Sequence, residues 1–223
     1  MKVSMSRMED SETLQDLGRA SIQIVHDLKN QLNGLKLYAT FLRRRIEKSE
    51  RPEDEQETIA KLMAGLDRAA SDLATIVEYG RKIELKKQQG FEVQKVLRTV
   101  CSTVDSQGAE IVVDSNSDSL QGSFDPLKLT DAFKWISAAA IKNRLPNEDG
   151  VKAKPVSVKV AVVDNQDAII EWSGLRKIDH DPFHSFMGSE EIRLALAAKI
   201  IEAHGGSAKL AEDRFVVQLP LSD

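Results

Sequence analysis

The chain has 223 residues, of which 41% are hydrophobic and 30% charged, a composition typical of a folded protein with one large or two modest domains. Its net charge of −4 gives no sign of the basic surface that nucleic-acid binding favours, so we expect no nucleic-acid partner. The single cysteine, Cys101, excludes an intramolecular disulfide and suits a reducing compartment.

The apolar segments give no indication of a membrane protein or a secreted one. No apolar run approaches the roughly 20 residues that a transmembrane helix needs. Residues 1–17, MKVSMSRMEDSETLQDL, lack the apolar core of a signal peptide. We therefore expect a soluble, cytoplasmic protein that does not associate with a membrane.

Two long helices are predicted between Ser11 and about Lys87, separated by a polar break at Glu47–Gln56 that contains Pro52. On both sides of the break, apolar residues recur at steps of three and four, which is the heptad pattern of a helical seam. The seam positions are Leu28, Leu32, Leu35, Ala39, Leu42 and Ile46, then Ile59, Leu62, Leu66, Ala69, Leu73, Ile76, Gly80 and Ile83. One helical hairpin cannot bury both seams well, whereas two can do so in a four-helix bundle, so we expect a homodimer.

Beyond a change of composition at Lys86–Phe91, predicted helices alternate with strands. Three helices are expected, over Phe91–Val104, from Asp125 to about Arg144, and from Ser189 to a Gly-Gly stop. A strand is expected at Ala109–Ser115, and hairpins at Val156–Gly174 and Ser207–Leu221. The fold class is therefore α+β, with a helical hairpin over residues 1–88 and an α/β-sandwich domain over residues 89–223.

A polar cluster lies on the outer face of the first predicted helix. With residues advancing by about 100° each, His26 points roughly 160° away from the seam position Leu28, and Asn30 lies one turn above it. Asp27 lies at the flank, with Gln31 one turn above it. A neighbouring carboxylate can hold one imidazole nitrogen as N–H and make the other more nucleophilic, and an amide can orient water or a phosphoryl oxygen. The alternative for a lone helical histidine is an ordinary solvated face.

The segment HDLKNQL, residues 26–32, resembles the phosphoacceptor box of bacterial two-component histidine kinases, which lies on a dimeric dimerisation and histidine-phosphotransfer domain. The resemblance implies that His26 is phosphorylated and that Asp27 is its acid/base partner. It also implies that Asn30, or Gln31 in a variant of the box, supports hydrolysis of a partner's aspartyl phosphate. A response-regulator receiver domain would dock on the first helix, with outward-pointing Lys29, Asn33, Lys36 and Thr40 as candidate contacts.

The order of elements after residue 90 is similar to the GHKL-type ATP-binding domain of the same kinases, and AAKIIEAHGGSAKL resembles its last helix and hairpin. The family's Gly-x-Gly-x turn, however, falls on Glu191–Leu194, its metal- and nucleotide-binding asparagines on Trp135 and Ala139, and its Asp-x-Gly-x-Gly box on Trp172–Arg176. A glutamate repels phosphate at a helix N-terminus, and neither Trp nor Ala can ligate Mg²⁺. We therefore expect a degenerate domain with no ATP or metal of its own, and Mg²⁺ supplied by the receiver partner.

The other histidines are weaker signals. His180 and His184, with Asp181, could imitate metal ligands, but Pro182 between them makes a continuous helical turn unfavourable. His204 is interpreted as a helix-terminal cation that suits the helix dipole.

Three functions fit these features. The first is a histidine phosphotransferase of a phosphorelay, which carries phosphoryl groups between response-regulator aspartates through His26 and has no ATP-dependent kinase activity of its own. The second is a non-catalytic dimeric adaptor that binds a response regulator or a kinase. The third is an active sensor histidine kinase with an unusual ATP site.

Overall fold

The structure is a computed structural model that describes residues 25, 28–44, 53–105, 111–114, 120–146, 153–163 and 166–221. The chain divides into two compact units, Met1–Arg81 and Lys82–Asp223. The first unit is helical and the second combines helices with sheet, so the expected mixed α+β class is confirmed. None of the helices described has both the length and the apolar character needed to cross a membrane.

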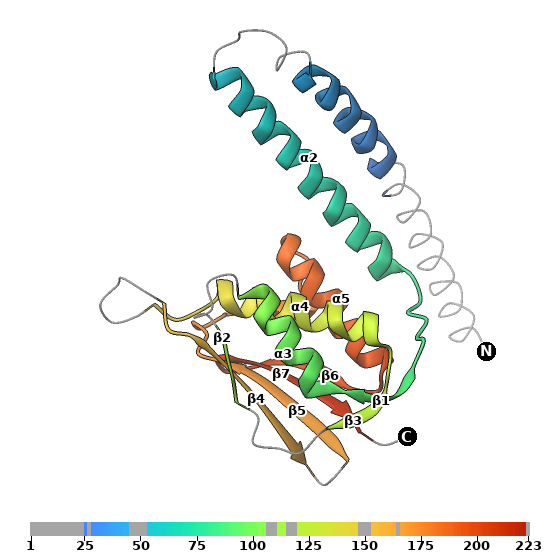
Figure 1. Cartoon of the computed structure of the whole chain (residues 1–223), viewed down its shortest axis with the longest axis vertical. Helices are drawn as coiled ribbons and strands as arrows, with labels where there is room; N and C mark the ends of the chain where they lie inside the picture. Colours follow the sequence, from blue (N-terminus) through green and yellow to red (C-terminus); the bar gives the residue numbers. More distant parts are fainter. Residues whose placement is uncertain are drawn as a thin grey trace, which may run out of the picture. The chain divides into compact units, whose positions relative to one another are not determined.

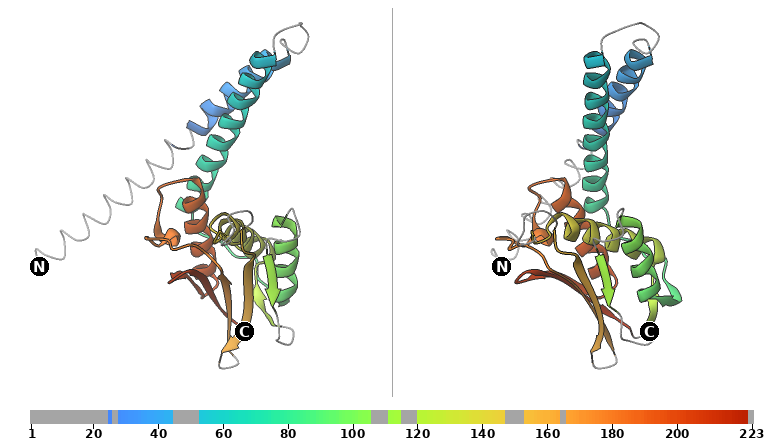
Figure 2. Two further views of the ribbon diagram at one scale, coloured as in Figure 1. Left: turned by 90° about the vertical axis from the view of Figure 1, so that its left-hand side faces the viewer. Right: turned by 60° about the vertical axis from the view of Figure 1, so that its left-hand side comes forward.

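The first unit contains a helix over residues 28–44 and the long helix α2, Glu53–Gly80. The two helices lie side by side, and the end of the first is close to the start of the second, so they run antiparallel (Figures 1 and 2). Lys36 and Asp67 join them through an ion pair of 2.5 Å between Nζ and Oδ1. Ala39, a seam position, is 3% exposed. The two long helices that the heptad pattern predicts are therefore present.

Several seam leucines remain half exposed within the single chain. Leu28 is 44% exposed, Leu35 54%, Leu42 53% and, on α2, Leu62 51%. Tyr38 and Phe41 add further exposed apolar surface to the first helix, at 68% and 57%. Because α2 alone leaves this much of the seam in water, the hairpin has an apolar face that its own chain does not cover.

The second unit is built on a five-stranded sheet with the strand order β2-β4-β5-β7-β6. The strands are β2 Ile111–Asp114, β4 Val156–Val163, β5 Asp167–Ser173, β6 Ser207–Ala211 and β7 Arg214–Pro220. All neighbours are antiparallel except β2 and β4, which run parallel. The predicted hairpins β4–β5 and β6–β7 are thus confirmed, in a sheet that is largely antiparallel.

Three helices cover one face of this sheet (Figures 1 and 2): α3 Val93–Val104, α4 Pro126–Lys142 and α5 Ser189–Ala203. Strand β4 shows why, because its alternate residues Val156, Val158 and Val160 are buried while Lys159 and Ala161 are exposed. Period-two alternation gives a sheet one apolar face, and the helices bury it. Helix α5 contributes eight buried residues to this core, and α4 packs against both α3 and α5.

Two short strands were not predicted. β1 Gln88–Glu92 pairs antiparallel with β3 Gln121–Phe124, and Phe91 lies opposite Gly122. The helix predicted from Phe91 therefore begins two residues later, at Val93. The rings of Phe91 and Phe124 pack edge to face, with centroids 5.8 Å apart, so the second unit gains a small aromatic cluster at this end.

Asp125 fixes the start of α4. Its Oδ1 accepts hydrogen bonds from the backbone N–H groups of Leu127 and Lys128, both at 3.1 Å, as an N-cap does. Its Oδ2 accepts from the N–H of Lys86 at 2.7 Å, which ties the segment before β1 to the helix. Burial alone would raise the pKa of Asp125, but these donors hold the pKa below its usual value.

His204 follows α5 and joins it to the cap of α4. Its Nε2 accepts from the N–H of Asp125 at 3.0 Å, and its Nδ1 lies 2.8 Å from the carbonyl oxygen of Ile200, to which it donates. The side chain is 2% exposed, and burial lowers its pKa. The interpretation of His204 as a helix-terminal cation is therefore wrong: an imidazole that accepts at Nε2 is neutral.

Candidate functional site

The predicted phosphoacceptor pair, His26 and Asp27, lies outside the described residues. Residue 25 and residues 28–44 are helical. Asn30 and Gln31, the amides assigned to hydrolysis, are both exposed in the first described turn. The structure thus places the two amides at the surface of the hairpin.

The four candidate docking residues differ in their surroundings. Lys29 is partly buried and Asn33 is exposed. Lys36 pairs with Asp67 of α2, and the Thr40 hydroxyl donates to the carbonyl oxygen of Lys36 at 2.8 Å. Lys36 and Thr40 are therefore both engaged within the hairpin, and a partner that used them would have to compete with these contacts.

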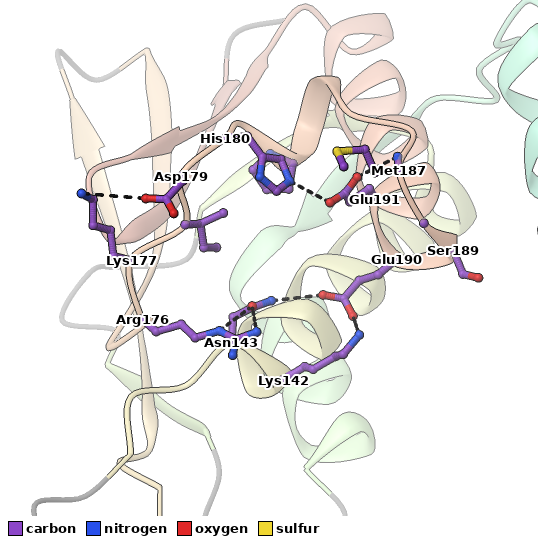
Figure 3. Close-up of a pocket in the computed structure, with 13 residues that line it drawn as sticks. Lys142, Asn143, Arg176, Lys177, Asp179, His180, Met187, Ser189, Glu190 and Glu191 are labelled. Atoms are coloured by element: carbon purple, nitrogen blue, oxygen red, sulfur yellow. Dashed lines mark hydrogen bonds and ion pairs between the residues drawn. The ribbon is translucent and has the colours of Figure 1, made fainter.

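A cavity of about 620 Å³ lies in the second unit, between the end of α4, the segment after β5 and the start of α5 (Figure 3). It is lined by Lys142, Asn143, Arg176, Lys177, Ile178, Asp179, His180, Pro182, Met187, Gly188, Ser189, Glu190 and Glu191. Two consecutive carboxylates, Glu190 and Glu191, occupy the first turn of α5 and point to opposite sides of the cavity (Figure 3).

Glu190 connects α5 to α4. It accepts hydrogen bonds from the Lys142 ammonium and, at 3.1 Å, from the Asn143 amide nitrogen. The Asn143 amide oxygen in turn accepts from Arg176 Nε and Nη2, at 3.2 and 3.1 Å. These contacts form a continuous polar network across one wall of the cavity, from the end of β5 to the start of α5.

Glu191 connects α5 to the opposite wall, residues 179–188, which we call the strap. Its Oε1 lies 2.7 Å from His180 Nε2, and its Oε2 accepts from the Met187 N–H at 2.8 Å and from the Ser185 hydroxyl. The hydrogen bond from Ser185, together with those from His180 and Met187, holds the pKa of Glu191 below its usual value although partial burial opposes this.

The two strap histidines bind different carboxylates. His184 Nδ1 pairs with Asp181 Oδ2 at 2.9 Å, whereas His180 pairs with Glu191. Pro182–His184 forms a short 3₁₀ helix, η1. Within the described ranges, no three His, Cys, Asp or Glu side chains are grouped so that they could hold a metal ion.

Two positions onto which the resemblance in sequence places ATP-motif residues, Trp172 and Ala139, are part of the core. Trp172 is fully buried, its indole N–H donates to the Ser137 hydroxyl at 3.0 Å, and its ring lies 6.2 Å from that of Phe133. Ala139 is 2% exposed. A carboxylate at position 172, where the family binds the adenine base, would lie in this apolar packing. Trp172 is therefore a core residue.

The charges that line the cavity balance. Three cations, Lys142, Arg176 and Lys177, face three carboxylates, Asp179, Glu190 and Glu191. Lys142 pairs with Glu190, and Lys177 lies 3.8 Å from Asp179. The cavity therefore lacks the excess positive charge that would offset the charge of a polyphosphate.

Glu190, Asn143 and Ser185 had no role in the sequence-based prediction. The acidic pair in the first turn of a predicted helix was a usable signal, because carboxylates stabilise that position. The sequence did not predict the hydrogen-bond donors of these carboxylates, because Lys142 and Ser185 come from segments far apart in sequence.

No protein-family model and no curated protein sequence matches this chain. Among solved structures, the chain is similar to full-length ShkA in complex with AMPPNP, with a TM-score of 0.69 and 17% identity over 89% of this chain. It covers 44% of ShkA, so it spans less than half of that chain. It is also similar to the Acinetobacter baumannii histidine kinase AdeS, with a TM-score of 0.57 and 17% identity, over 86% of this chain and 96% of AdeS. The chain therefore has a histidine-kinase-like fold.

Proposed function

We propose that this protein is a histidine phosphotransferase of a two-component phosphorelay, in which His26 accepts a phosphoryl group from the aspartate of one response regulator and passes it to another. The observation that carries the proposal is the pair of hydrogen-bonded carboxylates in the first turn of α5. One of them, Glu191, stands where the resemblance in sequence places the first residue of the family's phosphate-binding Gly-x-Gly-x turn. With a kinase-like fold but no excess positive charge in the cavity, a protein donor is favoured over ATP.

In the proposed reaction, a lone pair of the neutral His26 imidazole attacks the phosphorus of the aspartyl phosphate. The new N–P bond forms as the bond between phosphorus and the aspartate oxygen breaks, and the aspartate leaves as a carboxylate. Asp27 holds the N–H of the other ring nitrogen and stabilises the positive charge that develops on the ring. The receiver would bring Mg²⁺, and the relay protein would mainly position the imidazole.

The proposal includes a homodimer with a four-helix bundle. Its support is the half-exposed seam: Leu28, Leu35, Leu42 and Leu62 would all be covered by a second hairpin. Asn33 and Lys29 remain candidates for receiver contacts on the outer side of the first helix.

A transfer assay tests the proposal. Receiver domains from the same cell, phosphorylated on aspartate with a labelled phosphoryl group, are each mixed with the full chain, and label on the chain is followed over time. We expect at least one receiver to transfer label to wild type and to the matched control His184→Ala, which removes an exposed histidine of the second unit, but not to His26→Ala. If no receiver transfers label yet one binds the dimer, the chain is an adaptor and the proposal fails.

A second candidate is an atypical histidine kinase. Its support is that a cavity of about 620 Å³ persists beside Lys142 and Asn143, and that ShkA, whose fold this chain shares, was crystallised with AMPPNP. A nucleotide would then have to separate Lys142 from Glu190. Under this alternative, labelled MgATP alone would phosphorylate His26.

A further inference from the structure

We propose that Glu191 is a built-in anion that holds the strap closed over the start of α5. Helix N-termini attract anions because their N–H groups lack intrahelical partners and the helix dipole is positive there. Here the anion belongs to the helix itself and faces the strap rather than a ligand (Figure 3). This inference does not rest on the proposed phosphotransfer.

Three donors from three positions along the strap converge on this one carboxylate. His180 contributes its ring Nε2, Ser185 its hydroxyl and Met187 its backbone N–H. Hydrogen bonds to an ionised carboxylate are roughly twice as strong as bonds between neutral groups. The Glu191 side chain is only 19% exposed, so water competes weakly for the same oxygens.

Different forces hold the middle of the strap and the end that leads into α5. Phe183, 2% exposed, packs edge to face on Phe215 with ring centroids 5.3 Å apart, and Asp181 caps the N–H of Phe183 at 3.0 Å. Beyond this anchor, Phe186 and Met187 are 53% and 84% exposed, so burial contributes little to their position. The hydrogen bonds that Ser185 and Met187 donate to Glu191 therefore hold this end of the strap, while Phe183 fixes its middle.

Hydrogen exchange of the full chain, followed by mass spectrometry, tests this assignment. In wild type without nucleotide, we expect the Met187 amide to be protected. In Glu191→Ala, we expect exchange of residues 185–187 to rise about tenfold or more, with amides of β4 and β5 unchanged, because a charge-assisted cluster is lost.

Two controls make the test specific. Glu190→Gln alters the neighbouring carboxylate, which bonds to α4 and not to the strap, and should leave exchange of residues 185–187 within about twofold of wild type. Ser185→Ala removes one strap donor without touching α5, and should raise their exchange by a smaller factor than Glu191→Ala. If Glu191→Ala also loosens β4 and β5, Ser185→Ala alone decides the matter.

The proposal is overturned if residues 185–187 exchange as fast as free amides in wild type. It is also overturned if Ser185→Ala leaves them unchanged, or if Glu190→Gln raises their exchange as much as Glu191→Ala does. None of these outcomes depends on whether a receiver transfers phosphate to His26, so the two proposals fail independently.

Discussion

At the scale of single residues, His204 and Asp125 show how one buried pair joins two helices. The imidazole accepts the N–H of Asp125, and the Asp125 carboxylate caps α4 and holds Lys86. The two groups that face His204 electrostatically are Asp125, which favours the protonated ring, and Lys87, which disfavours it. Burial is the larger effect, so the folded protein keeps the ring neutral.

Protonation of His204 should therefore destabilise the second unit. The pKa of His204 in the folded state lies below the ordinary value of 6.5. As the pH falls below about 7, the unfolded chain therefore binds more protons at this position than the folded chain does. The contribution of the neutral ring is fully present above that range and is lost as the pH falls toward the folded pKa. We expect His204→Gln, which can keep both hydrogen bonds, to weaken this dependence between pH 7 and 5.

Urea unfolding followed by tryptophan fluorescence measures the effect, because Trp135 and Trp172 both lie in the second unit. The matched control is His184→Gln, the same replacement at an exposed histidine of the second unit. We expect the pH dependence to weaken more in His204→Gln than in this control. If the free energy of unfolding depends on pH equally in wild type and in His204→Gln, then His204 does not release a proton on folding.

At the scale of secondary-structure elements, the turn from α5 into β6 depends on close backbone contact. A Cβ added to Gly206 would lie 2.2 Å from the carbonyl oxygen of Gln218 in β7. By contrast, a Cβ on Gly188, before α5, would have no atom within 4 Å. The two glycines that bracket α5 thus serve different purposes.

We expect Gly206→Ala to lower the free energy of unfolding by about 2–4 kcal/mol, because the β6–β7 pair must shift to admit the methyl group. Gly188→Ala should change it by less than about 0.5 kcal/mol. Denaturant midpoints of the two variants, measured side by side, give the comparison. A Gly206→Ala variant as stable as Gly188→Ala would contradict the close approach of β6 and β7.

Strong periodicity explains which elements were predictable. The heptad seam identified the two long helices, and two β-branched runs on either side of a polar turn identified the β4–β5 hairpin. Strands β1 and β3, with sequences QQGFE and QGSF, are short and polar, and they pair across a whole helix, so no local pattern marked them. The contacts of Glu191 also had no local sequence pattern, because the path of the strap decides which donors reach this carboxylate.

At the scale of the whole molecule, the proposed dimer would cover the exposed apolar face of the hairpin. Leu35 and Leu37 are nearly equally exposed in the single chain, at 54% and 55%, but Leu35 lies on the seam and Leu37 about 160° away from it. Exposure alone does not distinguish them, whereas a dimeric bundle does.

We therefore expect Leu35→Lys to shift the protein toward monomer by at least tenfold in dissociation constant, because it buries a charge in the bundle. Leu37→Lys should leave self-association as in wild type. Sedimentation equilibrium across a range of concentrations measures both. A monomeric wild type, or equal effects of the two variants, would contradict the bundle.

In the proposed relay, the phosphoryl group reaches His26 from a protein and not from ATP. The most direct measurement offers the full chain both donors in separate samples, labelled MgATP and a labelled phospho-receiver identified in the transfer assay, with His26→Ala beside wild type. We expect label on wild type from the receiver only, and none on His26→Ala from either donor. Label on His26 from MgATP alone would contradict the proposed relay.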